Sequence, residues 1–314
     1  MHTPVLLDAA VDALAIRADG VYVDGTFGYG GHSRLILSKL GESGRLIVFD
    51  KDPVAVSVAR SIQDKRLHVV HGNYTDIDGV LRALAITGVD GILLDLGVSS
   101  MQLEGVTRGF SFRHGGQLDM RMDTSRGETA AQWLATVDEA TLKKVIRDYG
   151  EERYAGQIAS AIVIERARQP VANTLQLAEI VAAVVRARSH RREYRQHPAT
   201  RTFQAIRIYL NQELEALSLV LPMCLARLNP SGRLAVISFH SLEDRIVKKF
   251  MRVQAMTDAL PRKLPVRDYE RLQHSQQKLL LIGKKIRPDA TEIAANPRAR
   301  SAIMRVAEKL KPAS

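Results

Sequence analysis

The sequence predicts an α/β protein built on a doubly wound parallel sheet, with an all-helical segment inserted into it. Two observations carry this prediction. Short apolar strands alternate with amphipathic helices over the first 96 residues, and alternation of this kind produces parallel strands joined by right-handed crossovers. Helical periodicity without any strand pattern then runs from Thr129 to Arg188, before an apolar strand returns at Arg233–Phe239.

The first half of the chain supplies four strands and their helices. A helix opening at Thr3-Pro4 is expected first, because Thr caps helices and Pro suits the first turn. Strands are expected at Val21–Asp24, Leu46–Phe49, Leu67–His71 and Gly91–Leu96. Helices are expected at Ser33–Leu40, Val54–Ile62 and Ile77–Ala85.

The second half begins with an irregular, Gly- and Arg-rich stretch over 104–128. Four helices are expected after it, at Ala130–Thr136, Glu139–Tyr149, Glu151–Arg168 and Thr174–Arg188. One long helix, Thr202–Leu228, then returns the chain to the sheet, and Lys278–Ile282 with Ala302–Ala307 would form a final antiparallel pair. The expected domains are therefore a discontinuous sheet domain, 1–103 with 201–314, and a helical insertion, 104–200.

Charge indicates the kind of partner. The 314-residue chain has a net charge of +11 and a pI near 9.9, an excess that suits a polyanion such as nucleic acid. The single cysteine, Cys224, fits a reducing cytosol. No signal peptide and no apolar run long enough to cross a membrane is visible, so we expect a cytoplasmic protein with no membrane contact.

The stretch from Tyr22 to Ser33 is the most informative part of the chain. A strand ends in Asp24, a glycine-dense turn containing Gly28 and Gly30 follows, and a helix begins. Such a turn lets backbone N–H groups approach a ligand at the positive end of a helix. Asp50 ends the next strand, where nucleotide-binding folds place a ribose-binding carboxylate. The alternative is that these glycines only form a tight connection between the strand and the helix and bind no ligand. The spacing departs from G-x-G-x-x-G and is close to the D-x-G-x-G-x-G of S-adenosylmethionine enzymes.

Further polar residues fall where other strands end. Tyr74 follows the third strand and could pack on an adenine ring or sit half-buried in the core. Asp95 ends an otherwise apolar strand, where an unpaired carboxylate is costly if it is dry. Because ligands bind beyond the carboxyl ends of parallel strands, these side chains are expected near the glycine turn.

The string from Asp95 to Leu103, Asp-Leu-Gly-Val-Ser-Ser-Met-Gln-Leu, resembles the bacterial 16S ribosomal RNA cytosine-N4 methyltransferase family. The resemblance extends over nearly the full length. Its other segments are 2–7, 24–33, 108–112, 118–123, 150–153, 201–205, 237–245 and 296–301. Residues 254–276 match poorly.

The resemblance implies a class I, Rossmann-like S-adenosylmethionine methyltransferase fold and methyl transfer to a cytosine amine of the decoding region in small-subunit RNA. It also implies cofactor contacts at Gly30, Gly31, His32, Asp50, Tyr74, Asp95 and Gln102, to which the turn itself adds Gly28. Many amino-methylating enzymes place Asp/Asn-Pro-Pro-aromatic after the fourth strand. Here the acid is present and the aromatic is not, which leaves Phe110, Phe112 and Phe239 as candidates for stacking on the base.

A cytosine amine needs a group that accepts its N–H hydrogen bond. We expect Asp95 to be that acceptor, with Ser99, Asp119 and His240 as the other catalytic candidates. No cluster of His, Cys and carboxylates has metal-ligand spacing, so no metal is expected.

Two basic groups are predicted to bind RNA phosphates. The denser group holds Arg186, Arg188, Arg191, Arg192 and Arg195; the other lies on one helix and includes Lys248 and Lys249. The expected partner is 16S rRNA or the small ribosomal subunit, and a homodimer is left open.

Three other functions compete with the rRNA methyltransferase. A DNA amino-methyltransferase would carry the same charge, and a non-catalytic RNA-binding assembly factor would bind RNA without S-adenosylmethionine. A nicotinamide dehydrogenase is disfavoured by the glycine spacing and by the basic charge.

Overall fold

The computed structural model describes residues 4–113, 115–188, 197–256 and 277–311. The chain forms two compact units. The first unit comprises Met1–Gly97 with Leu214–Ser314, and the second unit is Val98–Glu213. The expected insertion, 104–200, falls inside the second unit, which also takes in the residues on either side of that segment.

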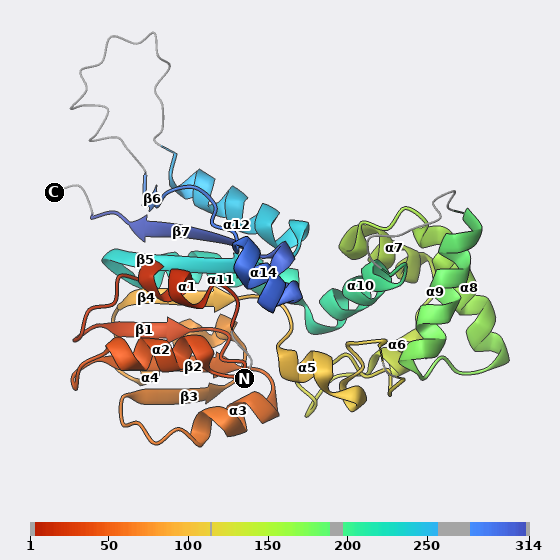
Figure 1. The fold of residues 1–314 in the computed structure, drawn as a ribbon, viewed down its shortest axis with the longest axis horizontal. Coiled ribbons are helices and arrows are strands. Elements are labelled where there is room, and N and C mark those ends of the chain that lie inside the picture. Colours follow the sequence, from red (N-terminus) through yellow and green to blue (C-terminus); the bar gives the residue numbers. More distant parts are fainter. Residues whose placement is uncertain (1–3, 114, 189–196, 257–276, 312–314) are drawn as a thin grey trace, which may run out of the picture. The chain divides into compact units, whose positions relative to one another are not determined.

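The first unit is built on a seven-stranded sheet with the order β3-β2-β1-β4-β5-β7-β6 (Figure 1). The first five strands are parallel, and β7 runs antiparallel to both β5 and β6. The chain moves outward from β1 to β3 and then returns to β4 beside β1, which creates a switch point between β1 and β4. The strands are β1 Val21–Asp24, β2 Arg45–Asp50, β3 Leu67–His71, β4 Val89–Asp95, β5 Leu228–Ser238, β6 Leu279–Leu281 and β7 Ile303–Lys309.

Helices cover both faces of this sheet, as a doubly wound fold requires (Figure 1). On one face, α4, α11 and α12 pack against alternate strand residues such as Ile47 and Ile92. On the other face, Leu14 at the end of α1 lies beside Tyr22 and Gly91, and α1 contacts α2. The helices of this unit are α1 Leu7–Ala13, α2 Gly31–Lys39, α3 Pro53–Arg60, α4 Ile77–Ala83, α11 Glu213–Arg227, α12 Ser241–Gln254 and α14 Ala290–Ala295, with 3-10 turns at Tyr74–Asp76 and Pro297–Ser301.

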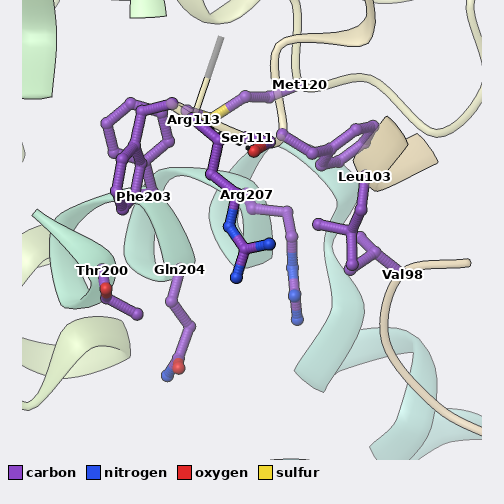
Figure 2. Close-up of a pocket in the computed structure, with 11 residues that line it drawn as sticks. Val98, Leu103, Ser111, Arg113, Met120, Thr200, Phe203, Gln204 and Arg207 are labelled. Carbon is purple, nitrogen blue, oxygen red and sulfur yellow. Dashed lines mark hydrogen bonds between the residues drawn. The ribbon is translucent and has the colours of Figure 1, made fainter. Parts of the chain in front are cut away.

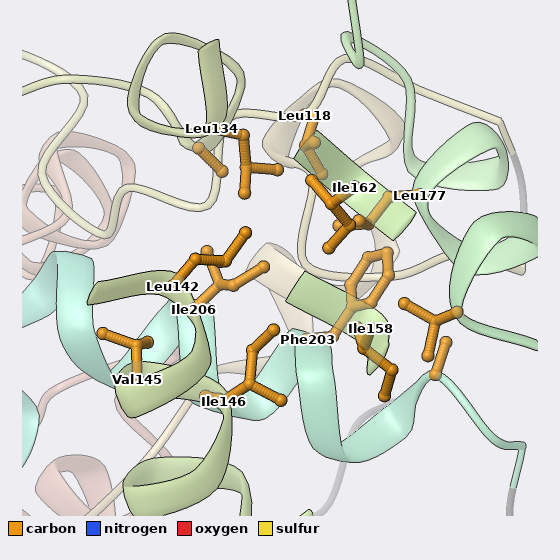
Figure 3. Close-up of a cluster of buried hydrophobic side chains, with 14 of the residues drawn as sticks. Leu118, Leu134, Leu142, Val145, Ile146, Ile158, Ile162, Leu177, Phe203 and Ile206 are labelled. Atoms are coloured by element: carbon orange, nitrogen blue, oxygen red, sulfur yellow. The ribbon is translucent and has the colours of Figure 1, made fainter. Parts of the chain in front are cut away.

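The second unit is helical and has its own hydrophobic core (Figure 3). Side chains such as Leu142, Ile158, Leu177 and Ile206 are fully buried in that core. Over the described residues 109–113 and 115–128, the chain carries no regular element apart from one isolated bridge, Gln117 to Asn173. The helices are α5 Ser100–Glu104, α6 Ala130–Thr136, α7 Glu139–Gly150, α8 Ala155–Arg168, α9 Thr174–Arg188 and α10 Thr200–Asn211, with a 3-10 turn at Val106–Arg108.

The structure differs from the expected elements at several places. The helix expected at Glu151–Arg168 begins at Ala155, and the strand expected at Arg233–Phe239 begins at Leu228. The long helix predicted over 202–228 is two helices, because Gln212 adopts a left-handed backbone (φ 51°) that ends α10. The first helix begins at Leu7, since Leu6 has a φ of 53° and cannot continue a right-handed helix backwards. The short helix α5, absent from the prediction, is started by Ser99.

Candidate active site

The glycine turn after β1 is fixed by Asp24, whose side chain is 1% exposed. Its Oδ1 accepts the Thr26 N–H at 3.0 Å, and its Oδ2 accepts the Ser33 hydroxyl at 2.6 Å. One buried carboxylate thus ties the first residues of the turn to the first turn of α2. A buried charge needs such partners to remain tolerable.

Two glycines in this turn are required by the geometry. Gly30 is the N-cap of α2 with a φ of 75°, and a Cβ there would lie 2.4 Å from the Phe27 ring. At Gly31, a Cβ would lie 2.0 Å from Pro4 Cγ. A side chain at either position would push the turn away from its neighbours. Glycine at both positions therefore allows Phe27 and Pro4 to pack directly against the turn and the start of α2.

Asp50 lies at the end of β2 and holds the same turn from the neighbouring strand. Its Oδ2 accepts the Gly28 N–H and its Oδ1 accepts the Asp52 N–H, both at 2.8 Å. Burial raises the pKa of Asp50 to about 6, against the lowering effect of these two backbone donors. Each carboxylate oxygen can accept a second hydrogen bond, as a ribose-binding acid requires.

Asp95 ends β4, next to β1 across the switch point. Its backbone N–H donates to the Thr26 hydroxyl at 2.7 Å, which joins the two strand ends. Its Oδ1 is shielded from solvent and has no hydrogen-bond partner among the described residues. Burial, followed by the nearby charges of Asp24 and Glu243, raises the pKa of Asp95 well above its ordinary value. The site therefore contains a buried carboxyl group that a proton, a hydrogen-bond donor or a nearby positive charge would stabilise.

His32 faces Asp95 from the first turn of α2. Its Nε2 lies 3.2 Å from the Val5 carbonyl oxygen, so the neutral ring carries its proton there and donates to that oxygen. The remaining nitrogen, Nδ1, lies 3.7 Å from Asp95 Oδ2. Burial is the main cause that lowers the pKa of His32, whose side chain is 5% exposed. A neutral His32 thus presents a lone pair, rather than a positive charge, to Asp95.

Glu243 organises the end of β5 and the start of α12. Its Oε2 accepts the N–H of Phe239 at 2.8 Å and that of His240 at 3.3 Å. His240 caps α12 by accepting the Glu243 N–H on Nδ1 at 3.4 Å, and its Nε2 lies 3.2 Å from Glu243 Oε1. His240 is therefore placed in the first unit as a helix cap, while its catalytic role stays a prediction.

The other residues predicted for cofactor contacts and catalysis divide between the two units. Tyr74 lies in the first unit, half-buried, with its Cβ against Gly25. Ser99 and Gln102 lie in the second unit and bond to each other in a capping box at the start of α5. Asp119 is also in the second unit, where both its oxygens accept from the Arg121 guanidinium at 2.8 to 2.9 Å. The catalytic roles of Ser99 and Asp119 stay predictions.

The predicted RNA-binding residues also lie on both units. Arg186 and Arg188 are exposed in the last turn of α9. Lys248 and Lys249 are exposed on α12, where Arg245 and Arg252 extend the same basic face. The remaining three predicted arginines lie outside the described residues: Arg191, Arg192 and Arg195.

The residues of the first unit fit S-adenosylmethionine. The unsatisfied Oδ1 of Asp95 and the buried carboxyl groups around it suit a ligand that carries a positive charge, as a sulfonium does. The turn leads into the positive N-terminal end of α2, and Asp50 offers acceptors for hydroxyl groups. Among the described residues, no group of three or more His, Cys, Asp or Glu side chains is arranged to hold a metal ion.

Residues 1–310 match the family model described as the MraW methylase family. The chain belongs to this family. It is similar to the ribosomal RNA small subunit methyltransferase H of Nitrosomonas europaea, with 71% identity over 100% of this chain and 99% of that protein. Proteins of the same name from Azoarcus sp. and Neisseria meningitidis serogroup C are 57% and 56% identical. Each of those two alignments covers 98% of this chain, and 96% and 92% of the respective relative.

Membership in a methylase family, together with the sheet order, establishes the class I S-adenosylmethionine methyltransferase fold predicted from the sequence, with S-adenosylmethionine as the cofactor. A Streptococcus mutans methyltransferase crystallised with SAH shares 12% identity over 99% of this chain and 100% of that one. The TM-score between the two structures is 0.45. No helix in the described ranges combines the length and apolar character needed to span a membrane.

Sequence reasoning left three site residues without a role. Thr26 joins Asp24 to the Asp95 backbone, Ser33 completes the Asp24 contacts, and Glu243 adds charge near Asp95. A Thr and a Ser close to a strand-ending Asp, within a glycine turn, is a usable signal for the first two. No local signal identifies Glu243, because its place depends on β5 lying beside β4.

Proposed function

We propose that this protein transfers a methyl group from S-adenosylmethionine to N4 of a cytosine in the decoding region of 16S rRNA. The observation that carries the chemistry is Asp95, a carboxyl group with an unsatisfied buried oxygen at the end of β4. The choice of substrate is supported by the names of relatives up to 71% identical and by the net charge of +11.

Bound S-adenosylmethionine supplies an electrophilic methyl group. In the reaction the amine nitrogen forms the new N–C bond, the C–S bond breaks with its electron pair moving to sulfur, and the amine loses one proton. Asp95 accepts the hydrogen bond of the amine and then this proton. Its raised pKa suits the task, because a more basic carboxylate draws the proton more strongly as the amine nitrogen becomes positive.

His32 and the glycine turn prepare Asp95 for this role. The Nδ1 lone pair of His32 faces Asp95 Oδ2, where it can accept a hydrogen bond from the protonated carboxyl group. Thr26 fixes the Asp95 backbone to the turn that would hold the donor. Asp50, Gly28, Gly30, Gly31 and Tyr74 are the proposed cofactor contacts of this unit; Gln102 of the second unit is a further one.

The second unit is the proposed RNA-docking part of the molecule. Arg186 and Arg188 at the end of α9 offer exposed charge there, and Lys248 and Lys249 add charge from the first unit. Phosphate contacts of this type position RNA and make its binding dependent on salt. The target cytosine would have to leave its stack to reach a carboxylate.

The test uses the purified full chain with a methyl-labelled donor and three substrates: small ribosomal subunits, free 16S rRNA and DNA. We expect label in RNA, and nucleoside mass spectrometry should find it as N4-methylcytidine at one position. Label in DNA alone would favour the DNA amino-methyltransferase. RNA binding without donor binding, measured by calorimetry, would favour the assembly factor.

A further inference from the structure

The second unit contains a pocket of about 230 Å³ whose walls are largely aromatic and aliphatic (Figure 2). Phe110, Phe203 and Met120 are buried in its walls at 7%, 4% and 0% exposure. Phe112 is half-buried and meets Phe203 edge-on, with ring centroids 4.8 Å apart. The remaining lining residues are Val98, Leu103, Ser111, Arg113, Thr200, Gln204 and Arg207.

Hydrogen bonds fix the orientation of two polar side chains that line this pocket. The Arg207 guanidinium donates to both carboxylate oxygens of Glu213 at 2.8 Å, which sets the plane of the guanidinium. The Gln204 amide nitrogen donates to the Tyr149 carbonyl oxygen at 3.2 Å, which orients the amide. Arg113 is exposed, and Figure 2 shows Arg113 and Arg207 between Phe203 on one side and Leu103 on the other.

The aromatic and arginine side chains of this pocket indicate what kind of ligand it binds. Aromatic faces and guanidinium planes stack on flat, apolar rings, and arginines beside them attract an anion. An unpaired nucleobase with its phosphate has both features. The volume is below the range of about 300 to 1,000 Å³ typical of drug-sized ligands, so it suits one base rather than a larger ligand.

We propose that the pocket of the second unit binds one unpaired base of the RNA substrate, with Phe112 as the stacking surface and Arg113 on the adjoining phosphate. This inference rests on the proposed function, because it takes the bound nucleic acid to be RNA. A base held here would anchor the strand through contacts made entirely by residues of the second unit.

The test is a coupling experiment between protein and RNA. Oligonucleotides from the decoding region, each with an abasic site at a different position, are titrated with the full chain and with Phe112→Ala by fluorescence anisotropy. Loss of one aromatic–base stack lowers affinity about tenfold. We expect Phe112→Ala to lose that factor on intact RNA and to lose almost nothing further on the one oligonucleotide that lacks the bound base.

Matched variants separate the pocket from general effects. Phe112→Leu keeps apolar bulk without an aromatic face and should lose most of the same affinity. Arg113→Ala should weaken binding more than Arg168→Ala, an equal loss of charge from exposed α8 in the same unit. Leu175→Ala, at a side chain 42% exposed outside the pocket, should bind RNA normally. Trp133, the only tryptophan of the chain and 4% exposed in this unit, reports folding through its emission.

The inference is overturned if folded Phe112→Ala and Phe112→Leu bind RNA like the wild type, or if no abasic position couples to residue 112. Failure of the proposed function looks different. In that case no label reaches RNA from the methyl donor, although the coupling at one base can persist.

Discussion

The two units of the chain use polar residues in different ways. In the first unit, Asp24 and Asp50 are turned inward, and each of their oxygens holds a nearby N–H or hydroxyl group. In the second unit, the pocket walls are aromatic, and Arg113 stands exposed at its edge. The first arrangement suits a small ligand gripped by backbone groups, and the second suits a chain that enters from solvent. Substitutions in the two units should therefore change different measurements.

The largest expected effect is on catalysis, at Asp95. Asp95→Asn keeps the shape and removes the proton acceptor, so the single-turnover rate at saturating donor should fall about 1,000-fold, within the range for a lost general base. Asp119→Asn is the matched change in the second unit, where the carboxylate pairs with Arg121. We expect it to lower thermal stability and to reduce the rate less than Asp95→Asn does. A folded Asp95→Asn protein within tenfold of the wild-type rate would contradict the assignment.

The next effect is on stability, at Asp50. Because its folded pKa of about 6 lies above the ordinary value, the native state binds this proton more tightly than the unfolded state does. The unfolding free energy of the wild type should therefore fall relative to that of Asp50→Asn as pH rises from about 4 to about 6, by at most about 3 kcal/mol. Urea unfolding across this pH range measures the difference. If the wild type instead became more stable relative to Asp50→Asn as pH rose, the raised pKa of Asp50 would be wrong.

The third effect is on donor binding, at Gly30. Gly30→Ala places a Cβ against the Phe27 ring in a left-handed backbone, so the affinity for S-adenosylhomocysteine should fall about 100-fold, or about 2.7 kcal/mol. Gly283→Ala is the control, since Gly283 has a φ of 66° and open space around its Cβ position. Isothermal calorimetry should find near-normal binding in that control. Equal losses in both variants would mean that backbone strain alone, not the turn, controls affinity.

The smallest effect is electrostatic, at Lys248 and Lys249. Each change to Ala should weaken RNA binding only a few-fold and reduce the slope of log affinity against log salt by about 0.7 to 0.9. Lys284→Ala, also exposed in the first unit, is the control with the same change in charge. An unchanged salt slope in the α12 variants would remove that helix from the RNA-binding surface.

Strand positions were predictable because the parallel strands carry short apolar runs that end at polar residues. β1 and β3 begin and end at the expected residues, and α6 and α9 do so as well. The break at Gln212 was missed because the apolar periodicity continues across it, while the left-handed turn is held by tertiary bonds. Asn211, for example, donates to the Met120 carbonyl oxygen and accepts the Met122 N–H.

The site was predictable only in part, for a related reason. Strand ends and glycines are local signals, so Asp24, Gly30, Asp50 and Asp95 could be singled out along the chain. The contact between His32 and Asp95 and the charge from Glu243 depend on strand order, which brings together residues far apart in sequence. The capping box of Ser99 with Gln102 carried a readable Ser-x-x-Gln pattern, and α5 could have been predicted from it.

Hydrogen–deuterium exchange of the full chain tests the division of labour between the units most directly. S-adenosylhomocysteine should slow exchange in peptides covering residues 24–33 and 95, and a decoding-region oligonucleotide should slow it in peptides covering 110–113 and 203–207. Slowed exchange by S-adenosylhomocysteine confined to peptides of the second unit would contradict the account.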